Sequence, residues 1–185
     1  MITKTPVQDL NHINKLNPNQ ATQGRRKKMN TLRRLFGQKQ SAPKKTSGPL
    51  DTHQAEKLWQ EAYDFFRSDN KKDHIKAVEI ALRLIEDGPN DAFTKSKLQC
   101  FIADIYSQKL EEHDKAIKYY QDALESDPGN SLAGSNLGFV YLNYKKDYES
   151  AAKVLQQTLD RGVSSAFVRE STKDWLAEAK QKLGR

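Results

Sequence analysis

The sequence QCFIADIY, residues 99–106, comes back 35 residues later as GSNLGFVY, residues 134–141. Both copies place a large apolar residue directly before a small one, and both end on tyrosine. The positions that match at this offset are Ile102 with Leu137, Ala103 with Gly138, Tyr106 with Tyr141, Ala116 with Ala151, and Tyr120 with Leu155. Five matches at one offset indicate an internal repeat of a short structural unit.

A third, more divergent copy precedes these two. Its second half lies 39 residues before the next copy, with Ala77 matching Ala116, Ala81 matching Tyr120, and Pro89 matching Pro128. In its first half Trp59, Ala62 and Phe66 fit the pattern, whereas Tyr63 stands where a small residue is expected. We therefore predict a first repeat that departs from the other two.

From Asp51 onward the apolar residues recur at the spacing of amphipathic helices. Gly88-Pro89 and the Pro128-Gly129 turn end two of the helical segments, because Gly tolerates left-handed backbone and Pro cannot extend the hydrogen-bond ladder. The predicted helices are residues 52–67, a segment from the polar break at 68–72 to Gly88, and residues 91–109, 114–126, 131–144, 148–161 and 165–183. These helices pair into hairpins, and the last one is left over.

The leftover helix is expected to cap the third hairpin. The residues expected to face that hairpin are Phe167, Ser171, Trp175, Ala179 and Leu183. Arg169, Lys173, Glu178 and Lys182 are expected to face water.

This pattern resembles the tetratricopeptide-repeat family, in which the first helix carries aromatic, large, small and aromatic residues and the second carries Ala-x₃-aromatic and Pro. The resemblance implies an all-α, right-handed α-solenoid with repeats at about 52–90, 91–130 and 131–163 and a capping helix at 165–183. The loop between the paired helices is one residue longer than the family norm in the second and third repeats. Residues 51–185 are thus predicted to form one helical repeat domain.

The resemblance also implies a concave groove, lined by the first helices, that holds an extended peptide or a helix of a partner protein. The groove residues it assigns are Lys57, Gln60, Glu61, Asp64, Lys97, Cys100, Phe101, Asp104, Ser135, Asn136, Phe139 and Asn143. Phe101 and Phe139 are the expected anchors of a bound segment. The alternative, that both pack in the core, stays open at this point.

One use of such grooves in the family is to hold the C-terminal carboxylate of a chaperone tail between two basic residues and two asparagines. Lys57 fits the first basic position, but Glu61 stands where an asparagine is required and would repel a carboxylate. We do not expect this activity.

Residues 1–50 differ in composition from the rest of the chain. They contain eleven Lys and Arg and one acid, a net charge of +10, whereas residues 51–185 contain 20 Lys and Arg and 23 acids, a net charge of −3. The segment is predicted to be a basic, largely disordered tail, with a short amphipathic helix at 29–36. Met29 opens a plausible alternative start of the protein.

The basic tail suggests a second kind of function. Nucleic acid phosphates or anionic lipid headgroups are its expected ligands, and the alternative is a tail that only aids solubility. The candidate polyanion-binding residues are Arg25, Arg26, Lys27, Lys28, Arg33 and Arg34, within a basic region at 25–45. The protein is thus predicted to be an adaptor that binds a protein segment and is tethered through its tail. The alternative is a structural subunit of a ribonucleoprotein or membrane-surface complex, bound mainly through that tail.

Catalysis, by contrast, is not predicted. Cys100 is the single cysteine, expected as a small semi-buried core residue, and His74 and His113 are expected in surface loops without a ligand-spaced partner. We expect no enzyme activity, no metal or cofactor, and no small-molecule substrate. An intracellular, cytoplasmic location is expected, with an organellar transit segment at the N-terminus as the alternative.

Overall fold

The computed structural model describes residues 49–89 and 91–184. The basic tail, its helix at 29–36 and its six candidate polyanion-binding residues lie outside the described residues, so those predictions stay predictions.

The described residues form helices and connecting turns, with no strand among them. The α-helices are α2 (Thr52–Arg67), α3 (Lys71–Asp87), α4 (Ala92–Asp104), α5 (His113–Ser126), α6 (Ser131–Val140), α7 (Tyr148–Arg161) and α8 (Ala166–Leu183). Two π-helical turns, η1 (Ile105–Lys109) and η2 (Tyr141–Lys145), extend α4 and α6. The predicted all-α fold is confirmed, and each predicted helix is present.

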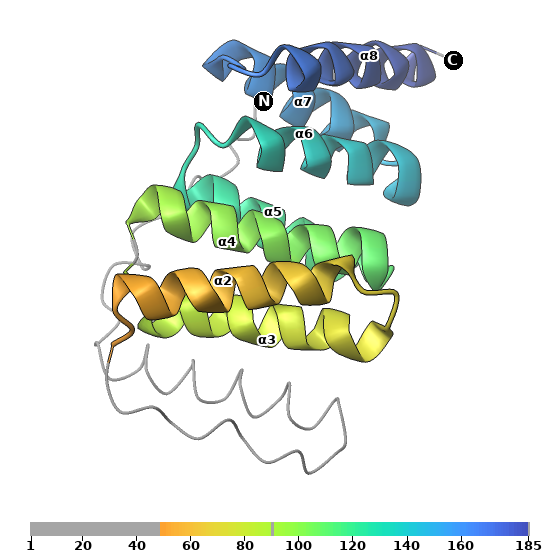
Figure 1. Ribbon diagram of the computed structural model, residues 1–185. Coiled ribbons are helices and arrows are strands. Elements are labelled where there is room, and N and C mark those ends of the chain that lie inside the picture. The colour runs from red at the N-terminus through yellow and green to blue at the C-terminus, as the bar shows by residue number, and fades with distance from the viewer. Residues whose placement is uncertain (1–48, 90, 185) are drawn as a thin grey trace, which may run out of the picture. The chain divides into compact units, whose positions relative to one another are not determined.

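The helices pair as α2 with α3, α4 with α5 and α6 with α7, and these hairpins stack one on the next as an α-solenoid (Figure 1). Helix α8 packs on α7 and α6 at the end of the row. Polar caps start the helices: the side chains of Asp91 and Asn130 accept from the backbone N–H groups of Thr94 and Ala133.

The repeated motif builds the core. Ile102, Ala103 and Tyr106 of α4 and η1 are buried, and Leu137 of α6 is 2% exposed. Their partners on the second helices, such as Tyr120, are buried as well. The positions that match at the 35-residue offset are therefore mainly positions that the hairpins bury.

The small position of the motif marks where two helices approach closely. A Cβ built on Gly138 of α6 meets Cγ and Cδ2 of Leu155 on α7 at 2.4 Å, well inside van der Waals contact. Leu155 is fully buried and has little room to withdraw. Only glycine fits at this crossing with the present packing.

The register predicted for the first repeat is one residue out. The structure buries Ala62 completely and leaves Tyr63 43% exposed. Ala62 is therefore the small residue at the crossing of α2 with α3, and the motif begins at Leu58 rather than at Trp59. This shift removes the need for a bulky Tyr63 at a crowded position, and it moves the outward-facing residues of α2 by one.

The extra residue in the second and third hairpins is accommodated by η1 and η2. In η1 the N–H of Leu110 bonds the carbonyl of Ile105, five residues earlier, so the turn holds one residue more than an α-helical turn. A left-handed residue follows each π-helical turn, Glu111 (φ 57°) after η1 and Lys146 (φ 55°) after η2. The two hairpins thus solve the same insertion in the same way.

The predicted contact face of the capping helix is partly wrong. Phe167 is 82% exposed and Leu183 52% exposed, so neither packs on the third hairpin. The face that does pack carries Thr172, Leu176 and Ala179, which are buried. Arg169, expected to face water, donates from Nε and Nη2 to the carbonyl of Val163, and this contact fixes the start of α8.

Candidate functional site

A groove of about 670 Å³ runs across the first helices of the repeats. We call it the α2–α4–α6 groove. The residues that line it are Thr52, Ala55, Glu56, Trp59, Leu84, Gly88, Pro89, Phe93, Thr94, Lys97, Leu98, Cys100, Phe101, Asp104, Asp127, Gly129, Asn130, Ser131, Leu132 and Ser164. All three hairpins contribute, so an occupant of this groove would contact the whole row of first helices.

Large apolar side chains form one wall of the groove. Trp59 on α2 is 37% exposed, Phe93 on α4 is 56% exposed, and Leu132 on α6 is 47% exposed. Exposed apolar groups gathered along one groove are a usual mark of a binding surface, whereas scattered ones are not. The wall therefore favours an occupant with apolar side chains.

Phe101 forms the floor beside this wall and is only 7% exposed. Its ring centroid lies 4.9 Å from that of Trp59, 6.2 Å from Tyr63 and 5.4 Å from Phe66, so the aromatic residues of α2 pack across the boundary between the first two repeats. Phe101 is thus chiefly a core residue that supports Trp59, and Trp59 presents the accessible surface.

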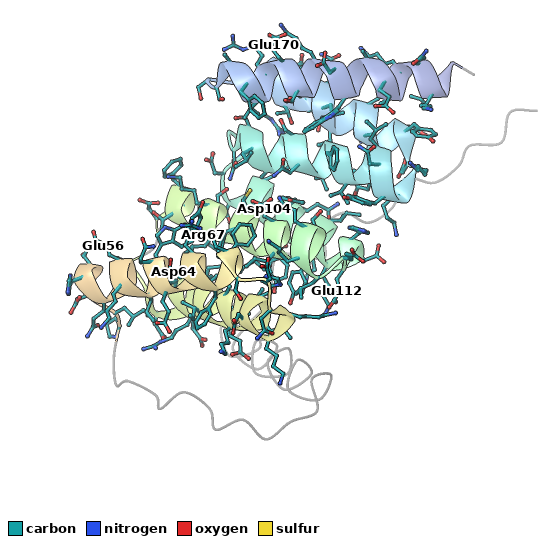
Figure 2. All side chains as sticks on the ribbon, turned by 45° about the vertical axis from the view of Figure 1, so that its right-hand side comes forward. Glu56, Asp64, Arg67, Asp104, Glu112 and Glu170 are labelled. Atoms are coloured by element: carbon teal, nitrogen blue, oxygen red, sulfur yellow. The ribbon has the colours of Figure 1, made fainter. Side chains whose placement is uncertain are left out.

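Asp104, the last residue of α4, also lines the groove (Figure 2). Its Oδ1 accepts hydrogen bonds from the Tyr120 hydroxyl at 2.5 Å and from the Asn136 amide nitrogen at 2.9 Å. Burial raises the pKa of the Asp104 carboxyl, and these two hydrogen bonds oppose the rise. No hydrogen bond from a described residue reaches its Oδ2, which leaves one carboxylate oxygen for an occupant.

The charged residues of the groove are mostly acidic. Glu56, Asp104 and Asp127 line it together with one cation, Lys97. The Lys97 ammonium lies 4.3 Å from the centroid of the Phe93 ring, where the face of the ring holds it by a cation–π contact. Figure 2 shows Glu56 toward the start of α2 and Asp104 on the neighbouring α4. The groove thus combines an apolar wall with a net negative charge.

A second, smaller cavity of about 240 Å³ lies toward the other end of the first helices. Tyr120, Phe139, Tyr144 and Trp175 are the aromatic residues that line it, and the ring centroids of Phe139 and Trp175 are 4.8 Å apart. Tyr144 also stacks on His113, with centroids 3.8 Å apart. These rings mainly pack against each other, so the cavity offers less free apolar surface than the larger groove.

The structure brings together only some of the predicted groove residues. Lys97, Cys100, Phe101 and Asp104 all line the α2–α4–α6 groove. Asn136 and Phe139 line the second cavity instead. The four residues predicted from the first helix line neither space: Lys57, Gln60, Glu61 and Asp64.

Two residues predicted from the third repeat are engaged inside the protein. Ser135 is 1% exposed and its hydroxyl shares a hydrogen bond with Thr172 of α8, so the capping helix covers it and it does not line a groove. Asn143 donates to the carbonyl of Phe139, one turn earlier, and lines neither space. The capping helix thus covers Ser135, whereas Asn143 is held by its own helix.

The groove residues that sequence reasoning missed include one acid and three large exposed apolar residues: Glu56, Trp59, Phe93 and Leu132. The register error in the first repeat explains the first two, because moving Lys57 and Gln60 back by one gives Glu56 and Trp59. The signal that would have found them is Ala62, a small residue in the middle of α2 that suits a helix crossing. Phe93 and Leu132 lie in the first turns of their helices, ahead of the repeated motif.

The remaining titratable groups do not form a reactive site in the described part of the chain. His74 is 5% exposed, so its predicted place in a surface loop is wrong: it lies in the first turn of α3, and its ring Nε2 is 2.7 Å from the carbonyl of Ser68. Burial raises the pKa of the Cys100 thiol well above its ordinary value, as expected for an inert core cysteine. No group of three metal-ligating side chains occurs among the described residues.

None of the described helices combines the length and the apolar character that crossing a bilayer requires.

Several solved structures share this fold. The Sgt2 tetratricopeptide-repeat domain from Aspergillus fumigatus is 22% identical with a TM-score of 0.57, covering 77% of this chain and 85% of that one. The TPR2B domain of yeast Sti1, in a pHsp70 complex, is 24% identical with a TM-score of 0.56, covering 69% and 97%. The first such domain of Spaghetti (RPAP3), bound to an HSP90 peptide, is 18% identical with a TM-score of 0.57, covering 74% and 98%. At these identities the likeness establishes the tetratricopeptide-repeat fold.

The family described as soluble NSF attachment protein, SNAP, matches residues 36–180, which is most of the chain. The search of curated proteins returned no significant match. The fold and this match together confirm the predicted tetratricopeptide-type repeats, and they show that the chain belongs to the soluble NSF attachment protein (SNAP) family.

Proposed function

We propose that this protein is an adaptor that holds a segment of another protein in the α2–α4–α6 groove. The observation that carries the proposal is the apolar wall of Trp59, Phe93 and Leu132, which crosses all three repeats and leaves large side chains exposed. A groove of this size suits a peptide or one face of a helix better than it suits a small polar substrate.

The comparisons support an interaction role. The yeast Sti1 domain was solved with pHsp70 and the RPAP3 domain with the HSP90 peptide SRMEEVD, so the same fold holds protein segments in both. The name of the SNAP family likewise describes attachment to another component, NSF.

The groove of this chain is not suited to an acidic C-terminal peptide. Asn136, one of the predicted groove residues, already donates to the internal carboxylate of Asp104. Glu56 and Asp127 add negative charge along the same groove. We therefore expect SRMEEVD to bind weakly or not at all.

Selection from a phage-displayed library of random 12-residue peptides, with the full chain as bait, tests the proposal. We expect selected peptides to lose affinity at least tenfold for the double variant Phe93→Ser/Leu132→Ser. The matched control is Phe167→Ser, which removes another exposed apolar side chain outside the groove and should leave affinity unchanged. If no peptide is selected, or if the control variant weakens binding equally, the groove is not the binding site.

The charge of the tail supports a second role, in which residues 25–45 tether the adaptor to a polyanion. The net charge of residues 1–50 is +10, enough for several phosphate contacts. The alternative function, a structural subunit of a ribonucleoprotein or membrane-surface complex, would rest on this tail alone. Both readings predict binding that weakens steeply with salt.

The full chain with Arg25, Arg26, Lys27, Lys28, Arg33 and Arg34 changed to Gln separates these roles. We expect it to lose binding to a polyuridine RNA or to phosphatidylserine vesicles while it keeps its affinity for selected peptides. Peptide binding that disappears with the tail charges would instead make the tail the main functional part.

A further inference from the structure

We propose that the α2–α4–α6 groove selects a partner segment that carries an arginine or lysine beside large apolar side chains, and that Asp104 binds the cation. This inference rests on the proposed function, since it names the kind of segment that the groove holds. It also predicts that the groove prefers basic segments to acidic ones.

The first argument is the state of the Asp104 carboxylate. It lines the groove, is largely buried, and forms no ion pair with a described residue. Its two hydrogen bonds, from Tyr120 and Asn136, both reach Oδ1, and each donor is neutral. A buried carboxylate without a counter-charge is costly, so a cation supplied by a partner would remove part of that cost.

The second argument is the position of Asp104 relative to the apolar wall. Asp104 follows Phe101 on α4 by three residues, so the two side chains share one helix face, and Phe101 contacts Trp59. A segment that places its cation at Asp104 therefore meets the aromatic wall with its neighbouring residues. Arginine suits this setting well, because its guanidinium can both pair with a carboxylate and stack on an aromatic face.

The third argument is the charge of the whole groove. Three acids against one lysine leave it with a net charge of −2 among the residues that line it. The ammonium group of that lysine, Lys97, already makes a cation–π contact with the ring of Phe93. An acidic segment would meet repulsion along the groove, whereas a basic one would be attracted during approach as well as in the complex.

The test uses the peptides selected from the random 12-residue library. We expect Arg or Lys next to large apolar residues to be enriched among them. In the best synthetic peptide, changing that Arg or Lys to Gln should weaken binding to the wild-type chain at least tenfold. This comparison needs no protein variant, so it holds whatever a substitution does to folding.

Asp104→Asn completes a double-mutant cycle. Asn keeps a side-chain oxygen for Tyr120 and Asn136 but removes the charge, so the variant should fold and should bind the basic peptide at least tenfold more weakly. The same variant should bind the Gln-substituted peptide as the wild type does. The matched control is Asp64→Asn, an exposed carboxylate one helix away that lines no groove, and it should change neither affinity.

The outcomes separate this inference from the proposed function. Peptides that depend on Phe93 and Leu132 but lack basic residues, or that bind Asp104→Asn as well as wild type, would overturn the inference and leave the adaptor function standing. No selected peptide at all would remove both. Tightest binding by a synthetic peptide of residues 25–37 of this chain, or dimerisation lost in Phe93→Ser/Leu132→Ser, would assign the groove to a different occupant and overturn the inference.

Discussion

Gly138 combines two opposing effects that a single substitution can weigh. In an isolated helix Gly138→Ala would gain about 1 kcal/mol from helix propensity. In this protein the added methyl group would lie 2.4 Å from the branched end of Leu155, which is fully buried. Overpacking of this kind costs about 1–3 kcal/mol, so we expect a net loss of stability and a lower Tm, measured by thermal and urea unfolding.

A second substitution shows whether that contact is the cause. Leu155→Ala alone should destabilise the protein by about 2–5 kcal/mol, because it leaves a cavity. In Gly138→Ala/Leu155→Ala the new methyl group occupies part of that cavity, so the double variant should be more stable than the sum of the single effects predicts. Strict additivity would mean that the two residues do not share this space.

Asp104 should make stability depend on pH in an unusual direction. Burial raises the pKa of its carboxyl above the ordinary 3.8, so the folded protein holds this proton more tightly than the unfolded chain. The contribution to the free energy of unfolding is therefore fully present below about pH 3.8 and is lost as pH rises through the raised value. Tyr120 and Cys100, the titratable neighbours, are neutral throughout this range.

The measurement is urea unfolding of Asp104→Asn and of the wild type, which gives the free energy of unfolding of each. It covers roughly pH 3.5 to 7, where carboxyl groups titrate. The stability of the variant relative to wild type should rise as pH rises. Asp91→Asn should show the opposite trend, since the backbone N–H of Thr94 lowers the pKa of Asp91. A pH-independent difference for Asp104→Asn would contradict the raised pKa.

At the scale of elements, each of the two hairpin turns contains one strained non-glycine residue, and a substitution by glycine should relieve that strain. Glu111 and Lys146 hold left-handed backbone, which costs a residue with a Cβ about 1–2 kcal/mol. Glu111→Gly or Lys146→Gly should therefore raise stability by about 0.5–1 kcal/mol, after the greater entropy of glycine in the unfolded chain is subtracted. Lys153→Gly, in the middle of α7, should instead lower stability by about 1 kcal/mol, and calorimetry distinguishes the two signs.

The helices themselves could largely be predicted from the sequence, because the amphipathic spacing and the Gly-Pro turn signals are local. Errors arose where a tertiary contact decides which face is buried. Either Trp59 or Leu58 could begin the motif of α2, and only the crossing at Ala62 shows which one does. In α8, Phe167 fits the apolar stripe by spacing, yet it stays exposed.

At the scale of the whole repeat domain, α8 should stabilise the third hairpin selectively. Leu176 and Ala179 pack with Leu142 and Leu155 in one apolar cluster. Deletion of residues 166–185 would expose that cluster, so hydrogen exchange should show lost protection in α6 and α7 while α4 and α5 stay protected. Deletion of Gly184 and Arg185 alone is the control and should change nothing. Equal loss of protection in every hairpin would show that the repeats unfold as one unit.

The candidate site could be predicted only in part, because a groove depends on how the repeats meet. Three residues predicted from the second repeat, Lys97, Phe101 and Asp104, line the groove. Those predicted from α2 do not, because the register is shifted by one residue, and the capping helix covers Ser135 of the third repeat. The hydrogen bond from Asn136 to Asp104 also joins two different repeats, and a local sequence pattern cannot predict such a contact.

That bond has a mechanical consequence. Asp104 of α4 accepts from Tyr120 of α5 and from Asn136 of α6, so a single carboxylate oxygen connects two successive hairpins. An occupant that binds this carboxylate would also act on the hydrogen bonds that connect the two hairpins. Asp104 would therefore be both a contact for a bound segment and the residue that joins the second hairpin to the third.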